Sequence, residues 1–160
     1  MVKSVLLPTD FSIRSLHIMR YALEENPDCE LRMFLVTGMR IPGSITELLF
    51  FSRKELIKKL QGQVFIEACQ IIRNKYQSHI NEVHFEIFTG MTQGAFNVFL
   101  EGNGIQHIYI PANKLHYKRP CFDPVSFMRN SKLPRNIVSW VEQEAAEESN
   151  YLGDLFKSWA

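Results

Sequence analysis

Short apolar runs alternate with stretches of helical periodicity along the first 141 residues of this chain. Five runs have the composition of β-strands: residues 2–7, 31–36, 83–87, 105–110 and 136–141. Between them, apolar residues recur at steps of three, four or seven, the spacing of one helical face. These stretches cover residues 13–23, 45–76, 95–100 and 120–129. The pattern predicts one parallel sheet wrapped by helices, with right-handed crossovers.

The junctions between these elements carry local signals that refine the prediction. Pro8 cannot donate to a strand ladder and suits the end of the first strand. Asp10 or Ser12 offers an oxygen to cap the following helix. Gly62 is costly inside a helix, so the long stripe over 45–76 is expected to break near it. Val83, Phe85 and Ile87 alternate with polar residues, which indicates an edge strand.

Residues 142–160 have a different pattern and form a separate unit, so we divide the chain into an α/β domain, 1–141, and an acidic amphipathic extension, 142–160. Apolar residues of the extension lie at helical spacing: Tyr151, Leu152, Leu155, Phe156 and Trp159. A helix with such a stripe needs a surface to cover. The surface is either the chain's own domain, which we favour, or a protein partner.

Composition places the chain among ordinary globular proteins, with 46% apolar and 22% charged residues. The first ten residues lack a signal-peptide pattern, and no apolar run is long enough to span a bilayer. A cytoplasmic location is therefore expected. Cys29, Cys69 and Cys121 are widely spaced without a C-x-x-C motif, so we expect neither a disulfide framework nor a zinc site.

The formal net charge of +1 hides a strong asymmetry along the chain. Residues 142–160 carry a net charge of −4, whereas residues 112–135 carry +5. Such a basic segment could attract an anionic ligand, a nucleic acid or the chain's own acidic extension. A solvated surface is the default interpretation, and we expect neither nucleic acid nor a membrane as a partner.

The first strand and helix resemble the universal stress protein family. The similarity is carried by VLLPTDFS at residues 5–12, followed by Ser15-Leu16 and Tyr21-Ala22-Leu23. The order of strands and helices matches through residue 141. The resemblance implies a Rossmann-like α/β fold with a five-stranded parallel sheet in the order 3-2-1-4-5 and helices on both faces. It also implies a homodimer, since the family often dimerises through its last strand.

Some members of this family bind ATP with the Asp that ends the first strand and a G-x2-G-x9-G-[ST] stretch after the fourth strand. Glycines there let main-chain N–H groups approach phosphate oxygens. Here the corresponding stretch begins PANKLHY at residue 111, with Ala112 and Leu115 at the first two glycine positions. Residues 105–149 contain no glycine. The sequence therefore disfavours ATP or AMP as a cofactor.

The candidate ligand site lies in the cleft at the carboxyl ends of the first and fourth strands. Its candidate residues are Pro8, Thr9, Asp10, Ala112, Asn113 and Lys114. For Asp10 we favour a structural role, as a cap of the following helix, over contact with a ligand. His17, His79, His84 and His107 are scattered without a metal-ligand spacing or a nearby carboxylate partner, so we expect no metal site.

No nucleophile elbow, P-loop or zinc-protease helix is present in the sequence, so we expect no catalytic residues. The function predicted is a non-catalytic stress-response or regulatory protein that does not bind ATP. One alternative is a small-molecule or nucleotide sensor using the cleft, with weak nucleotide hydrolysis as its enzymatic form. Another is an interaction adaptor that acts through the C-terminal helix.

Overall fold

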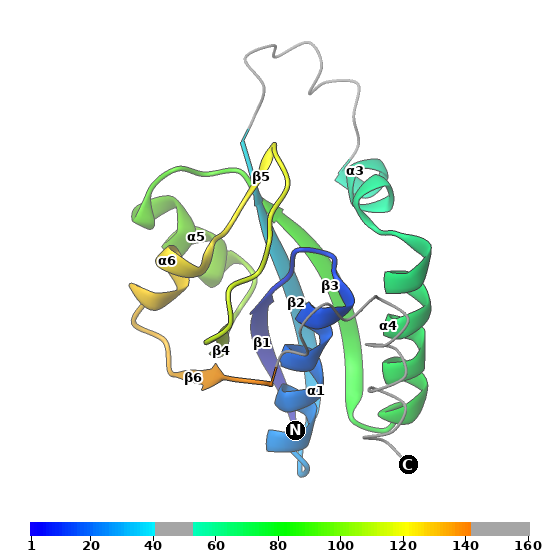
Figure 1. Ribbon diagram of the computed structural model, residues 1–160. Helices are drawn as coiled ribbons and strands as arrows, with labels where there is room; N and C mark the ends of the chain where they lie inside the picture. The colour runs from blue at the N-terminus through cyan, green and yellow to red at the C-terminus, as the bar shows by residue number, and fades with distance from the viewer. Residues whose placement is uncertain (41–52, 142–160) are drawn as a thin grey trace.

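A parallel sheet forms the centre of the molecule. The computed structural model describes residues 1–40 and 53–141. Its strands run in the order β3-β2-β1-β4-β6 (Figure 1). The bounds are β1 Val2–Pro8, β2 Glu30–Met39, β3 Ile80–Phe88, β4 His107–Pro111 and β6 Arg135–Val138. All pairings between these strands are parallel, which confirms the predicted order. The edge position of β3 was also predicted correctly.

Helices cover both faces of the sheet, as a doubly wound α/β fold requires. One layer contains a 3₁₀ turn η1, Ile13–Ser15, and α1, Leu16–Glu25, beside α4, Gln63–Lys75. The short α3, Arg53–Leu60, precedes α4 along the same side (Figure 1). The other layer contains α5, Gln93–Gly102, and α6, Val125–Arg129.

Each layer buries its own apolar cluster against the sheet. On the α1 and α4 side, fully buried side chains include Leu16, Met19 and Phe65. On the α5 and α6 side, Phe96 and Met128 pack against strand residues such as Ile108. The two clusters use alternate residues of β1, because successive side chains of a strand point to opposite faces.

The predicted helix break is confirmed, since α3 ends at Leu60 and Gly62 is the N-cap of α4. Two predictions were wrong, one of a helix and one of the end of a strand. The expected helix over 120–129 is instead a short strand, β5 Cys121–Phe122, followed by α6. The last strand ends at Val138 rather than at residue 141. Pro124 stands at the N-cap of α6, where a proline is tolerated, whereas inside the longer helix it would remove a hydrogen bond.

Two predictions fall outside the described residues. These are the first part of the helical stripe, residues 45–52, and the amphipathic extension, residues 142–160. Within the described ranges, no helix is long and apolar enough to cross a membrane.

Candidate functional site

The order of the strands creates a switch point between β1 and β4. From β1 the chain continues to β2 and β3 on one side, and then returns to β4 and β6 on the other. In open α/β sheets, ligands bind in the crevice beyond the carboxyl ends of the strands at such a point. The candidate residues after β1 and after β4 therefore belong to neighbouring strand ends, as the sequence predicted.

Asp10 connects the two loops at this switch point. Its Oδ2 accepts a hydrogen bond from the backbone N–H of His116 at 2.9 Å, across 106 residues of sequence. Its Oδ1 accepts from the backbone N–H of Ser12 at 3.0 Å and from the Ser12 hydroxyl. The helix cap itself is Ser12, whose hydroxyl accepts from Ser15 N–H. Both carboxylate oxygens of Asp10 are thus engaged by the chain.

Thr9 is fully buried, and its hydroxyl serves the local turn. It hydrogen-bonds the Ser15 hydroxyl at 2.9 Å and accepts from the backbone N–H of Phe11 at 3.0 Å. Phe11 has φ of 60°, in the left-handed region that non-glycine residues rarely adopt. Its ring packs against Phe65 and Phe85, which stabilises this conformation. The turn after β1 is therefore fixed by side chains, with no glycine in it.

The candidate residues after β4 are also occupied by contacts within the fold. Ala112 N–H donates to the carbonyl of Val138 at 2.7 Å and so prolongs the β4–β6 pairing. The Asn113 side chain donates to the carbonyl of Trp140 at 3.0 Å and accepts from Trp140 N–H at 3.2 Å. The Lys114 carbonyl accepts a hydrogen bond from the Arg14 guanidinium at 2.8 Å. Of these three residues, Lys114 also lines an open hollow, which is described below.

Residues 112–123, here called the crossing segment, pass over the end of β1. The segment leaves β4, which is beside β1, and ends in β5, which pairs antiparallel with β2 on the other side of β1 (Figure 1). Arg40 N–H also donates to the carbonyl of Pro120 at 2.9 Å. The Arg119–Pro120 bond is cis. The chain therefore spans the crevice with its own backbone.

Side chains of the crossing segment fill the space below it. Leu115 is 2% exposed and belongs to the core cluster on the α1 side, and Tyr117 packs against the same cluster. The Tyr117 hydroxyl is buried and has no hydrogen-bond partner among the described residues. Burial, together with the nearby carboxylates of Asp123 and Asp10, raises the pKa of Tyr117 well above its usual range.

Phe122 closes the other end of the crossing segment. It is paired with Gly38 in the register of β5 and β2, and a Cβ at Gly38 would collide with its ring. This pairing was not predicted from the sequence. The available signal was Gly38 itself, because a glycine near the end of a buried strand often marks a close approach.

A basic hollow of about 860 Å³ is lined by residues of the crossing segment and by Arg40. Its lining includes three cationic side chains, Arg40, Lys114 and Arg119, with Asp123 as the single acid. The rest of the lining is largely apolar, with Leu115, Tyr117, Pro120, Cys121 and Phe122. Burial raises the pKa of Asp123, although the Val125 N–H and nearby Arg129 oppose the shift. Of the residues predicted for the cleft, only Lys114 lines this hollow.

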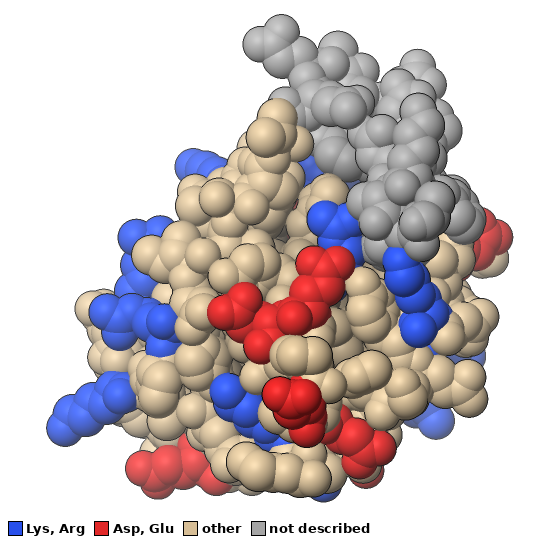
Figure 2. Space-filling model, turned by 90° about the horizontal axis from the view of Figure 1, so that it is seen from below, with Lys and Arg blue, Asp and Glu red and all other residues tan. Residues whose placement is uncertain are grey.

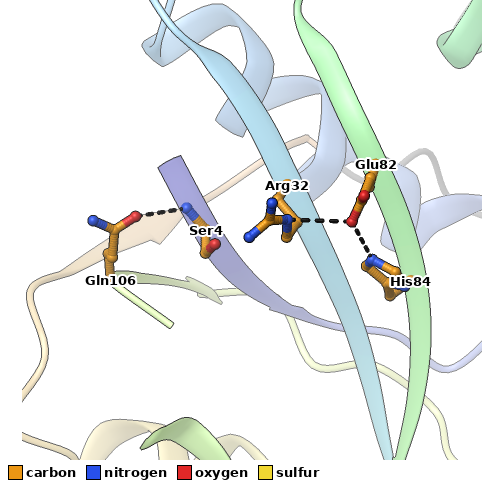
Figure 3. A network of polar contacts seen from close by, with 5 residues as sticks. All are labelled: Ser4, Arg32, Glu82, His84 and Gln106. Carbon is orange, nitrogen blue, oxygen red and sulfur yellow. Dashed lines mark hydrogen bonds and ion pairs between the residues drawn. The ribbon is translucent and has the colours of Figure 1, made fainter. Parts of the chain in front are cut away.

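A polar network on β2 and β3 was also missed (Figure 3). Glu82 accepts from the His84 ring at 2.7 Å and pairs with Arg32 at 3.2 Å. The hydrogen bond from His84 holds the pKa of Glu82 below its usual range. The expectation that no histidine has a carboxylate partner is therefore wrong for His84. The signal was the i, i+2 spacing, which places two strand residues on one face.

Among residues 1–40 and 53–141 there is no group of three His, Cys, Asp or Glu side chains that could hold a metal ion. All three cysteines, which lie in this part of the chain, are free thiols.

Comparisons with solved structures identify the architecture. The universal stress protein UspA from Lactobacillus plantarum aligns over 87% of this chain and 97% of its own, with a TM-score of 0.53 and 13% identity. A universal stress protein family member from Burkholderia pseudomallei aligns over 85% of this chain and 95% of its own, with a TM-score of 0.52 and 16% identity. The fold is that of the universal stress proteins. The resemblance predicted from residues 5–12 is thereby confirmed at the level of the fold.

A universal stress protein solved in complex with cAMP has the same fold, with a TM-score of 0.50 and 13% identity over 85% of this chain and 96% of its own. At identities this low, the universal stress protein fold is what the likeness establishes. No protein-family model matches the sequence, and no curated protein matches it. β5 and its pairing with β2 add a sixth strand to the five parallel strands.

Proposed function

We propose that this protein is a non-catalytic stress-response or regulatory protein that works without binding ATP in the crevice between β1 and β4. The observation that supports this is the crossing segment. In this segment the backbone is already engaged within the fold. The His116 N–H donates to Asp10, the Lys114 carbonyl accepts from Arg14, and the Leu115 side chain is buried, so these groups do not form a cradle for phosphates. A triphosphate in this crevice would have to displace these contacts and desolvate the Asp10 carboxylate beside its own charge.

Titration calorimetry with ATP and Mg²⁺ tests the proposal. We expect no binding heat at nucleotide concentrations up to the millimolar range. Binding with a low-micromolar Kd and one-to-one stoichiometry that Asp10→Ala abolishes would overturn it. The variant Lys132→Ala, which removes an exposed charge outside the crevice, is the matched control for non-specific charge effects.

A second candidate function, the binding of a small anionic molecule as a sensor, is favoured by the basic hollow. Three cations around a largely apolar lining suit a ligand that is both anionic and planar or apolar. In this case weak heat in the same titration would be lost in Lys114→Ala and Arg119→Ala but kept in Asp10→Ala. Native mass spectrometry of the purified protein would reveal a ligand that remains bound.

The proposal also includes a cytoplasmic location and a homodimeric assembly. Three free cysteines are typical of a reducing compartment, which supports a cytoplasmic location. β6 is the outer strand of the sheet, and its Ile137 is 62% exposed. No described strand pairs with its outer edge, and an edge of this kind with an exposed apolar residue supports pairing with a second copy, and hence a homodimer. Sedimentation of the full chain measures this state directly.

A further inference from the structure

The basic hollow combines positive charges from two parts of the chain. Arg40 follows the last residue of β2, whereas Lys114 and Arg119 come from the crossing segment. The pairing of β5 with β2 and the bond from Arg40 N–H to the Pro120 carbonyl bring the two parts together. With Asp123 as the one acid among the described lining residues, the charges there sum to +2. The hollow is therefore suited to a ligand with two negative charges.

Arg40, Lys114 and Arg119 have charges available for such a ligand. All three residues are exposed, and none forms an ion pair with another residue that the structure describes. Asp123 is engaged outside this group, since its Oδ1 accepts a hydrogen bond from Val125 N–H at 2.9 Å. An anion that enters the hollow can therefore bind these cations without breaking an existing ion pair.

The opposite end of the molecule carries a group of acids. Figure 2 shows this end from below, at the amino ends of the parallel strands, with acidic side chains near the middle of the face. Exposed acids at the end of α1 and the start of β2 are Glu24, Glu25, Asp28 and Glu30. An anion is thus repelled from these acids and attracted to the carboxyl ends of the strands, where the hollow lies.

Backbone donors near the hollow are partly engaged within the fold. In phosphate sites, backbone N–H groups usually surround the oxygens. Here the N–H groups of Arg40 and Cys121 donate to backbone carbonyls, and that of His116 donates to Asp10. The main donors left are two guanidinium groups, and the planar fork of each matches the two oxygens of a carboxylate. Two carboxylates therefore suit the hollow better than one phosphate.

Apolar side chains form the rest of the lining. They are the rings of Tyr117 and Phe122, together with Leu115, Pro120 and Cys121. The volume of about 860 Å³ lies in the usual range for small-molecule pockets, about 300–1,000 Å³. Aromatic walls favour a ligand with a flat apolar body. The Tyr117 hydroxyl is buried without a hydrogen-bond partner among the described residues, so it has a donor to offer.

We propose that the hollow binds an aromatic dicarboxylate. The guanidinium groups of Arg40 and Arg119 pair with its two carboxylates, and Lys114 adds a third positive charge. Its ring packs against Tyr117 and Phe122, and the Tyr117 hydroxyl donates to a carboxylate oxygen. This proposal rests on the second candidate function, the binding of an anion in the hollow, and it names the class of that anion.

Titration calorimetry of the full chain with terephthalate tests this proposal. We expect one-to-one binding. Benzoate, which lacks the second carboxylate, should bind about tenfold more weakly, and so should fumarate, which lacks the ring. Arg119→Lys keeps the charge but loses the fork, so it should weaken the binding of terephthalate roughly tenfold. Tyr117→Phe should weaken it roughly fivefold without lowering the free energy of unfolding, because the hydroxyl has no partner in the described fold.

Lys118→Ala is the matched control, because Lys118 is an exposed cation of the crossing segment that is not among the lining residues. It should change the affinity by less than about twofold. An equal loss in Lys118→Ala and Arg119→Lys would overturn the proposal, since it would mean attraction by charge alone. Tighter binding of phenyl phosphate would overturn the dicarboxylate and leave anion binding in place. Absence of binding by terephthalate and phenyl phosphate would overturn both, whereas ATP binding in the crevice bears on the first proposed function alone.

Discussion

Asp10 is the residue on which the two interpretations of the candidate site diverge most. As a ligand-binding residue it would be dispensable for folding, and its removal would leave stability unchanged or raise it. As a connecting residue it holds the loop after β1 to His116. We expect Asp10→Ala to lower the free energy of unfolding by about 1–2 kcal/mol, because one long-range bond and a turn are lost. Urea unfolding with an unchanged m-value measures this effect.

Asp10→Asn separates the two bonds. The amide oxygen can still accept from Ser12, but its NH₂ group would face the His116 N–H, so only the long-range bond is lost. We expect about half of the alanine effect. Equal stability of all three proteins would contradict the connecting role and would restore Asp10 as a ligand residue.

The sequence predicted the location of Asp10 but not its partner. A Pro-Thr-Asp junction at the end of an apolar run is a local pattern, and local patterns are visible in one sequence. The bond to His116 joins residues 106 positions apart, and it depends on the course of the whole crossing segment. Asn113 is similar, since both of its bonds go to Trp140.

At the scale of elements, β5 decides whether the crevice is open or closed. Gly38→Ala would place a methyl group against the Phe122 ring, so either the ring or β5 has to move away. We expect a loss of about 1–3 kcal/mol, the usual cost of overpacking. In a background of Phe122→Ala the same substitution should cost far less, so that a double-mutant cycle gives a double variant less destabilised than the sum of the two single variants.

Gly102→Ala serves as the control for the intrinsic effect of adding a methyl group. No atom lies within 4 Å of the Cβ that it would carry, and Gly102 is the last residue of α5, so this variant should be neutral or slightly stabilising. Additive effects of Gly38→Ala and Phe122→Ala would show that the ring does not press on β2.

β5 could not be predicted because it has two residues, too few for any periodic pattern. The apolar residues around it, Phe122 and Val125 to Met128, match a helical spacing equally well. Pairing with Gly38 and Met39 of β2 stabilises the strand conformation of Cys121 and Phe122 over a helical one. The longer elements had enough residues for the period of their apolar positions to identify them, and for these the prediction was correct.

For the whole molecule, the alternation of strands and helices was sufficient to predict the sheet. Right-handed crossovers leave few ways to arrange five strands joined by helices, and the similarity of residues 5–12 to the universal stress proteins selected one of them. The sequence indicated that the basic segment 112–135 could attract an anionic ligand, but it did not predict the hollow, because Arg40 joins Lys114 and Arg119 only after β5 pairs with β2. The closure of this crevice therefore depends on a short tertiary contact and not on the composition of the chain.

The raised pKa values of buried groups make the free energy of unfolding of the whole molecule depend on pH. Burial raises the pKa of Cys69 to about 12, and it also raises the pKa of Tyr117 and Tyr109. In the unfolded chain thiols ionise near pH 8.5 and phenols near pH 10. Between these values and the folded pKa values, the folded protein binds more protons than the unfolded one. Its free energy of unfolding therefore decreases as the pH rises.

We expect the decrease to begin above about pH 8.5 and to approach, for Cys69 alone, about 1.4 kcal/mol per pH unit. Urea unfolding at a series of pH values from 7 to 11 measures the slope. Cys69→Ala is less stable at pH 7 because it leaves a small cavity, but its slope between pH 9 and 10 should be shallower. The comparison uses slopes and not absolute values, so the packing defect does not interfere. Parallel curves for the two proteins would mean that the Cys69 thiol ionises in the folded state as readily as in the unfolded chain, and that the layer formed by α1 and α4 admits water.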